Sequence, residues 1–151
     1  MYFSWRTINL LSLLLVTKTG KLLYLIPALW TSLFDIAVTI IHQPDEYWQG
    51  DLTKANEGNP IDAFFMEGHV SGLFIISAVW IVIIILLGYF LPRSLAKTFL
   101  LFCVIAHSAA ASTWLTRFYG FWWMIIFILF NSILYVVTDH IVVKKHRNAR
   151  R

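Results

Sequence analysis

The sequence predicts an all-α integral membrane protein that folds as a bundle of four membrane-spanning helices. Of its 151 residues, 59% are hydrophobic and only 13% are charged, whereas a soluble domain carries about 25% charged residues. The mean hydropathy is +0.72, and four stretches are apolar over the roughly 20 residues that a helix needs to cross a bilayer. These features exclude a disordered chain, a secreted disulfide scaffold and an ordinary cytosolic domain.

The first apolar run, Ile8 to Val16, is too short to cross a bilayer alone. Arg6 precedes it, as in a signal peptide, but no small-residue cleavage site follows it. We expect an amphipathic helix that lies in the membrane interface, with Tyr2 and Trp5 at the depth of the lipid headgroups. The alternative is that this run continues directly into the first span.

The predicted spans cover residues 22–41, 70–91, 98–115 and 119–143. The third span is rich in small residues from Ser108 to Thr113, and small residues let helices approach closely. We therefore expect this span to pack in the centre of the bundle. One long connection, the outer loop 42–69, separates the first two spans. The whole chain, 1–151, is predicted to be a single transmembrane domain.

The basic residues predict the orientation, because Lys and Arg collect on the cytoplasmic side of membrane proteins. If the N-terminus is cytoplasmic, ten of the twelve basic residues lie inside, and only Lys54 and Arg117 lie outside. We therefore expect an integral protein of the plasma (inner) membrane with both termini cytoplasmic. The basic tail 144–151 should attract anionic lipid headgroups. Since orientation accounts for the net charge of +4, no nucleic-acid partner is expected.

The outer loop contains six of the eight acidic residues of the chain. Within it, Asn59 is a suitable N-cap, Pro60 suits the first helical position, and Asp62 falls in the first turn, where a negative charge is favourable. We therefore predict a short helix from Ile61 to Met66. A second interpretation is that Glu57 and Asn59 also face a polar pocket at the outer interface.

Asp35 is the strongest functional candidate, because an ionisable residue inside a span is costly to insert and is often functional. Thr39 and His42 follow at helical spacing, which gives the first span one polar face towards its outer end. Three interpretations remain open. Asp35 could pair with Arg117 or a histidine to fix helix packing, belong to a catalytic or metal site, or line a path for a substrate or ion.

Several other polar residues are expected near the same outer level. The candidates for acid–base or other catalytic roles are Asp35, Thr39, Glu57, Asn59 and Arg117. The candidate ligands for a divalent transition metal are Asp35, His42, Glu57 and His69. There is no glycine motif for a nucleotide. Haem is not expected, because His107 has no second histidine at a suitable depth, and a hydrogen bond from His107 to Asn131 is the simpler prediction.

The pattern Asp35-x-x-x-Thr39, followed by Glu57-Gly58-Asn59-Pro60, resembles one found in small multi-spanning prokaryotic membrane proteins of unknown function. The resemblance covers about the first 70 residues. The insert from Gln43 to Asn56 departs from the compact turn expected between these motifs. Because no activity is assigned to that family, the resemblance implies no particular chemistry.

Three functions are compatible with the sequence, and it leaves open whether the protein is an enzyme. The small size and the lack of a catalytic motif favour an accessory or self-associating subunit, which would form a homo-oligomer or bind a partner membrane protein. The second is an intramembrane enzyme or binding protein, whose outward-facing polar or metal pocket takes a lipid-linked or small substrate. The third is a component of an oligomeric transporter in which Asp35 titrates.

Overall fold

A computed structural model describes the backbone of residues 5–148 and the side chains of residues 20–145, 147 and 148. This part of the chain is helical and contains no strand. Its elements in order are α1 (Trp5–Ile41), α2 (Asp45–Trp48), the 3-10 turn η1 (Leu52–Lys54), α3 (Pro60–Gly68), α4 (Gly72–Phe90), α5 (Arg93–Tyr119) and α6 (Phe121–Asn148). The all-α prediction is confirmed.

Four helical segments among the described residues are long and apolar enough to cross a membrane. They are Gly20–Ile41 within α1, the whole of α4 and α5, and Phe121–Lys145 within α6. Each overlaps one of the four predicted spans. The predicted helix of the outer loop is also present, as α3, and it extends one residue before and two residues beyond the predicted limits.

The N-terminal run differs from the separate interfacial segment that we expected. The backbone from Trp5 to Ile41 forms one continuous helix of 37 residues, so this run continues into the first span. The expected headgroup anchors cannot be placed, because Tyr2 and the side chain of Trp5 lie outside the described residues. The last two arginines of the basic tail, Arg150 and Arg151, also lie outside them.

The turn between the last two spans also differs from the prediction. Residues 116–118 continue α5, and Tyr119, expected to begin the fourth span, ends α5 instead. The chain reverses at Gly120, whose φ of 95° lies in the region that favours glycine. The two polar residues at 116 and 117 suggested a turn, but polar side chains at the end of a helix can extend towards water without ending it.

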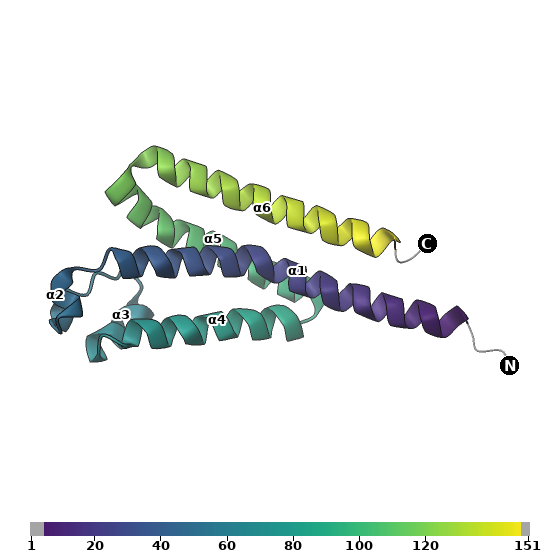
Figure 1. Ribbon diagram of the computed structural model, residues 1–151, viewed down its shortest axis with the longest axis horizontal. Coiled ribbons are helices and arrows are strands. Elements are labelled where there is room, and N and C mark those ends of the chain that lie inside the picture. Colours follow the sequence, from purple (N-terminus) through teal and green to yellow (C-terminus); the bar gives the residue numbers. More distant parts are fainter. Residues whose placement is uncertain (1–4, 149–151) are drawn as a thin grey trace.

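Helix α1 is the centre of the arrangement, because it packs against α4, α5 and α6. Helix α5 packs against α4 and α6 as well, while α4 and α6 do not touch each other within the described part. Figure 1 shows α4 and α6 on opposite sides of the α1–α5 pair. The start of α1 and the end of α6 lie at the same end of the bundle, and α2 and α3 lie at the other. We call these the terminal end and the loop end.

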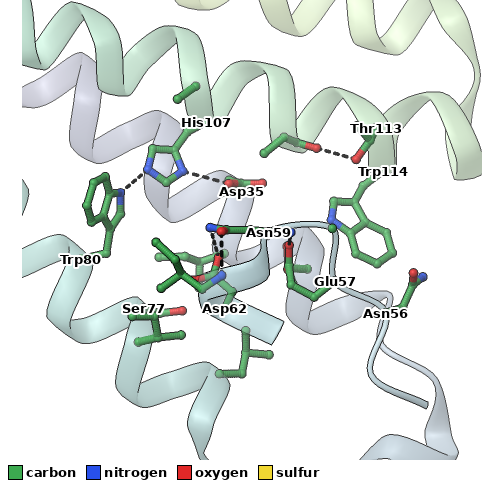
Figure 2. A pocket seen from close by; sticks show the side chains of 18 of the residues that line it. Asp35, Asn56, Glu57, Asn59, Asp62, Ser77, Trp80, His107, Thr113 and Trp114 are labelled. Atoms are coloured by element: carbon green, nitrogen blue, oxygen red, sulfur yellow. Dashed lines mark hydrogen bonds and ion pairs between the residues drawn. The ribbon is translucent and has the colours of Figure 1, made fainter. Parts of the chain in front are cut away.

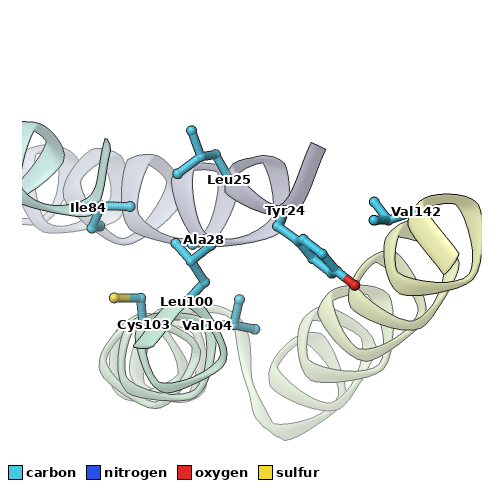
Figure 3. Packing of buried hydrophobic residues seen from close by; sticks show 8 residues of the cluster. All are labelled: Tyr24, Leu25, Ala28, Ile84, Leu100, Cys103, Val104 and Val142. Atoms are coloured by element: carbon cyan, nitrogen blue, oxygen red, sulfur yellow. The ribbon is translucent and has the colours of Figure 1, made fainter. Parts of the chain in front are cut away.

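The main hydrophobic core lies towards the terminal end and draws on all four long helices. Figure 3 shows how its side chains converge: Tyr24, Leu25, Ala28, Ile84, Leu100, Cys103, Val104 and Val142. Cys103 is fully buried in this cluster, which fits the packing role of an inert thiol. A second cluster, formed by α1, α5 and α6, lies nearer the loop end and includes Val38, Trp114 and Phe127.

Polar contacts hold the helices together at the terminal end. The Lys97 ammonium lies 2.8 Å from the Asp139 carboxylate, and the Tyr24 hydroxyl donates to the same oxygen over 2.6 Å. The Lys21 ammonium donates to the carbonyls of Tyr89 and Leu91, at 2.8 and 3.1 Å. These contacts link α1 to the end of α4 and α6 to the start of α5.

Close backbone packing fixes α3 against α4. A Cβ atom added to Gly72 would lie 1.8 Å from the carbonyl oxygen of Phe65, a distance that no side chain could tolerate. Buried Tyr47, Met66 and Leu73, from α2, α3 and α4, also pack together in one cluster. The position of α3 over the bundle therefore depends on the absence of a side chain at residue 72.

Substituting Gly72→Ala should push α3 away from α4. We expect a loss of about 1–3 kcal/mol of stability, the usual range for overpacking, measured by thermal unfolding of the full chain in a mild detergent. Gly68→Ala is the matched control, because an added Cβ there meets nothing within 4 Å. Equal stability of the two variants would contradict this interpretation of the α3–α4 junction.

Candidate functional site

A cavity of about 900 Å³ lies between α1, α4, α5 and the segment that contains the start of α3. Its polar lining comes from four parts of the chain. Helix α1 contributes Asp35 and Thr39, and the loop and α3 contribute Asn56, Glu57, Asn59 and Asp62. Helix α4 contributes Ser77 and Trp80, and α5 contributes His107, Thr113, Trp114 and Arg117. Except for Thr39 and Arg117, these side chains are labelled around the cavity in Figure 2.

A chain of two hydrogen bonds connects three helices at the wall of the cavity. The indole N–H of Trp80 donates to Nε2 of His107, and Nδ1 of His107 lies 2.8 Å from Oδ2 of Asp35 (Figure 2). An indole N–H can only donate, so Nε2 must be the unprotonated nitrogen. His107 is therefore neutral, carries its proton on Nδ1, and donates that proton to Asp35.

The second carboxylate oxygen of Asp35 is the open end of this chain. Oδ1 is buried and has no hydrogen-bond partner within the described structure, and the Asp35 side chain as a whole is only 13% exposed. A buried polar atom without a partner costs free energy and calls for an explanation. Because Asp35 lines the cavity, a ligand there is the natural source of a donor.

The first turn of α3 presents a preorganised polar edge to the same cavity. Asn59 caps the helix as predicted, since its Oδ1 accepts from the Ile61 N–H over 3.1 Å. Its Nδ2 donates to Asp62 over 2.9 Å, and its own backbone N–H donates to Glu57 over 2.7 Å. One asparagine thus orients two carboxylates, as the dashed lines from Asn59 in Figure 2 show.

The segment before α3 is anchored to the end of α1. The side-chain amide of Gln43, which is 5% exposed, donates to the carbonyl of Asn56 and accepts from its backbone N–H, both over 2.8 Å. The Gln43 side chain thus forms the same pair of hydrogen bonds with the Asn56 backbone that a neighbouring β-strand would form. It holds the backbone immediately before Glu57, and so it helps to position the carboxylates of the site.

The carboxylates of the α3 segment are destabilised in their charged form. Burial raises the pKa of Glu57 above its ordinary value of 4.5, and the negative charges of Asp62 and Asp35 act in the same direction. Burial likewise raises the pKa of Asp62, with a further contribution from Asp35, against a hydrogen bond from Asn59 that lowers it. The three acidic groups are therefore close enough to repel one another.

All five residues predicted as catalytic candidates contribute to the lining of the cavity. They are Asp35, Thr39, Glu57, Asn59 and Arg117. Arg117 is exposed, and its guanidinium lies 5.4 Å from the centre of the Phe118 ring. One interpretation of Asp35 was that it pairs with Arg117 or a histidine. Its partner in the structure is a histidine, His107 of α5.

The four predicted metal ligands are not brought together. His42 packs among the rings of Trp114, Phe118 and Tyr119, and its Nδ1 contacts the carbonyl of Val38. His69 ends α3, where it contacts Ser71. Both rings are used locally, so they do not join Asp35 and Glu57. No group of three His, Cys, Asp or Glu residues in the described part is arranged to hold a metal ion.

Three contributors to the site were not among the predicted site residues: His107, Trp80 and Asp62. His107 was expected to contact Asn131, but Asn131 accepts from Trp30 and donates to Ser108 instead. Asp62 was assigned only a capping role. The sequence feature that could have identified His107 as a site residue was its polarity in the middle of a span. Nothing in the sequence identifies the helix that it faces.

Comparison with known proteins gives no relative from which a function could be transferred. No protein-family model, curated protein or solved structure matches the chain.

The pKa of Glu57 predicts a pH-dependent contribution to stability. Because the pKa is raised in the folded state, this contribution is fully present below about pH 4.5 and is lost as the pH rises through the folded-state pKa. Glu57→Gln removes it. We therefore expect thermal unfolding in mild detergent to show a smaller loss of stability between about pH 5 and 8 for Glu57→Gln than for the wild type.

The control for this comparison is Glu46→Gln, at an exposed position in α2. This variant should follow the wild-type pH profile. Parallel profiles for Glu57→Gln and the wild type would contradict the burial of a destabilised carboxylate at residue 57.

Proposed function

We propose that the chain is an integral protein of the plasma membrane, with its four long helices as spans and both termini in the cytoplasm. The charge distribution supports this orientation, since the predicted topology leaves only Lys54 and Arg117 of the twelve basic residues outside. The positions of both termini at one end of the bundle agree with an even number of spans (Figure 1). The loop end, with the site, would then face outwards.

The basic C-terminal segment fits contact with the cytoplasmic leaflet. Lys144, Lys145 and Arg147 are exposed at the end of α6. A juxtamembrane basic residue gains about 1 kcal/mol near an anionic lipid surface. We therefore propose that anionic headgroups bind this segment and help to fix the orientation.

We propose that the protein binds an amphipathic ligand that enters the cavity from the membrane. One observation carries this proposal: a single cavity combines a polar cluster with an apolar wall that reaches the outer surface of the bundle. Val79 of α4 and Phe102 of α5 line the cavity, yet they are 46% and 56% exposed. In a membrane these exposed faces meet lipid, so an apolar tail could enter between α4 and α5.

The geometry favours binding over general-base catalysis by the histidine. Nε2 of His107 is the nitrogen that could accept a proton, but the Trp80 indole already occupies it. Cys103, the single cysteine of the chain, is buried in the hydrophobic core, and burial raises the barrier to forming a reactive thiolate. The Asp35 carboxylate has a buried oxygen without a partner, which suits recognition of a donor.

Filling the cavity should abolish ligand binding. Ala106 lines the cavity, and Ala106→Trp places a large side chain in it. We expect native mass spectrometry of wild-type protein, extracted in mild detergent, to detect a bound amphiphile that Ala106→Trp lacks. Its matched control is Ala109→Trp, on an exposed face of the same helix outside the cavity lining.

The outcomes of this experiment separate the proposed functions. Retention of the amphiphile by Ala106→Trp, or its absence from the wild type, would contradict ligand binding in the cavity. A partner protein at fixed stoichiometry with all three forms would favour the accessory-subunit hypothesis instead.

A further inference from the structure

The charges of the cavity define the kind of headgroup that it can accept. Its lining includes three carboxylates, Asp35, Glu57 and Asp62. The one basic side chain in the described lining is Arg117, because the Trp80 contact leaves His107 neutral. The cavity therefore has more negative than positive groups.

Arg117 does not neutralise these carboxylates. It lies ten residues beyond His107 on α5, which corresponds to about 15 Å along a helix axis. Within the described structure, its guanidinium contacts no carboxylate. The carboxylates that do contact a basic side chain there are Asp139, with Lys97, and Asp35, with the neutral His107. The acidic cluster of Asp35, Glu57 and Asp62 therefore has no positive partner within the described part of the chain, and a cationic ligand would supply one.

Two further features suit a protonated amine. The buried Oδ1 of Asp35 needs a donor, and an ammonium group supplies up to three. The rings of Trp80 and Trp114 also line the cavity, and aromatic faces attract cations. A carboxylate or phosphate headgroup would meet repulsion at the same position, and a hydroxyl would leave the negative charges uncompensated.

The rest of the cavity suits an apolar tail. The apolar lining from α4 and α5 includes Ile76, Val79, Ile83, Phe102 and Ala106. The cavity volume of about 900 Å³ falls within the range of about 300–1,000 Å³ that is typical of small-molecule sites. One end of the ligand is therefore cationic and the other is hydrocarbon.

We propose that the cavity binds an amphipathic cation: a protonated amine that carries an apolar tail, with its ammonium group on Asp35 and the α3 carboxylates. This inference rests on the proposed function, since it names the class of ligand for the same cavity. Beyond ligand binding itself, the inference states that the protein selects its ligand by the charge of the headgroup.

Three photoactivatable probes with the same alkyl tail test the proposal: a primary amine, an alcohol and a carboxylate. The full chain, in nanodiscs of neutral lipid, is exposed to each probe at pH 7, and crosslinked peptides are quantified. We expect the amine to label the α4 and α5 peptides of the cavity at least about tenfold more than the alcohol or the carboxylate, because a desolvated charge pair is worth a factor of ten or more.

Charge-neutralising variants identify the groups responsible. Asp35→Asn should reduce amine labelling to the level of the alcohol, and Glu57→Gln and Asp62→Asn should each reduce it in part. The last two substitutions keep the test valid if Asp35→Asn does not fold. Asp51→Asn, at an exposed loop position outside the cavity lining, is the control and should label like the wild type.

The possible failures are distinct. Equal labelling of the cavity peptides by all three probes, or full amine labelling of the three cavity variants, would overturn selection by charge while leaving ligand binding intact. No labelling of the cavity peptides by any probe would overturn the proposed function itself.

Discussion

An acidic side chain in the apolar part of a helix bundle must find a partner, and the contact between Asp35 and His107 meets this need. The two side chains are 13% and 15% exposed, and their polar atoms lie 2.8 Å apart. Trp80 completes the arrangement by fixing which nitrogen of the histidine carries the proton. Because these residues belong to α1, α5 and α4, one hydrogen-bonded chain connects the three helices that enclose the cavity.

The hydrogen-bonded chain Trp80–His107–Asp35 has two consequences for stability, and they act in opposite directions. It stabilises the contact between helices through two hydrogen bonds at poorly exposed side chains, where a hydrogen bond is stronger than in water. It also satisfies only one oxygen of Asp35, and the other remains buried beside Glu57 and Asp62. The bundle thus keeps an uncompensated acceptor at the place where the cavity is most polar, as expected of a site organised for a ligand before it arrives.

The local features of the fold were the most predictable from the sequence. Asn59 and Pro60 define the start of α3 through the chemistry of a single helix turn, and the apolar lengths define the four long helices. Asp35 was identified as a functional candidate by its polarity alone, because the free-energy cost of inserting an acidic residue into a span can be recognised without knowing its neighbours. His107 was assigned the wrong partner, since spacing along a helix does not specify how two helices are tilted or shifted relative to each other. His42 and His69 were expected near the same outer level as Asp35 and Glu57, yet local aromatic packing occupies His42 and a contact with Ser71 after α3 occupies His69.

The protonation of His107 is the most direct test of this organisation. Nitrogen-15 nuclear magnetic resonance of histidine-labelled protein in lipid distinguishes a protonated ring nitrogen from an unprotonated one. We expect a neutral His107 ring with its proton on Nδ1 and a bare Nε2, and we expect Trp80→Phe to alter the Nε2 signal. A proton on Nε2, whether in the neutral ring or in a doubly protonated one, would contradict the Trp80–His107–Asp35 chain, because the indole N–H could not then donate to that nitrogen.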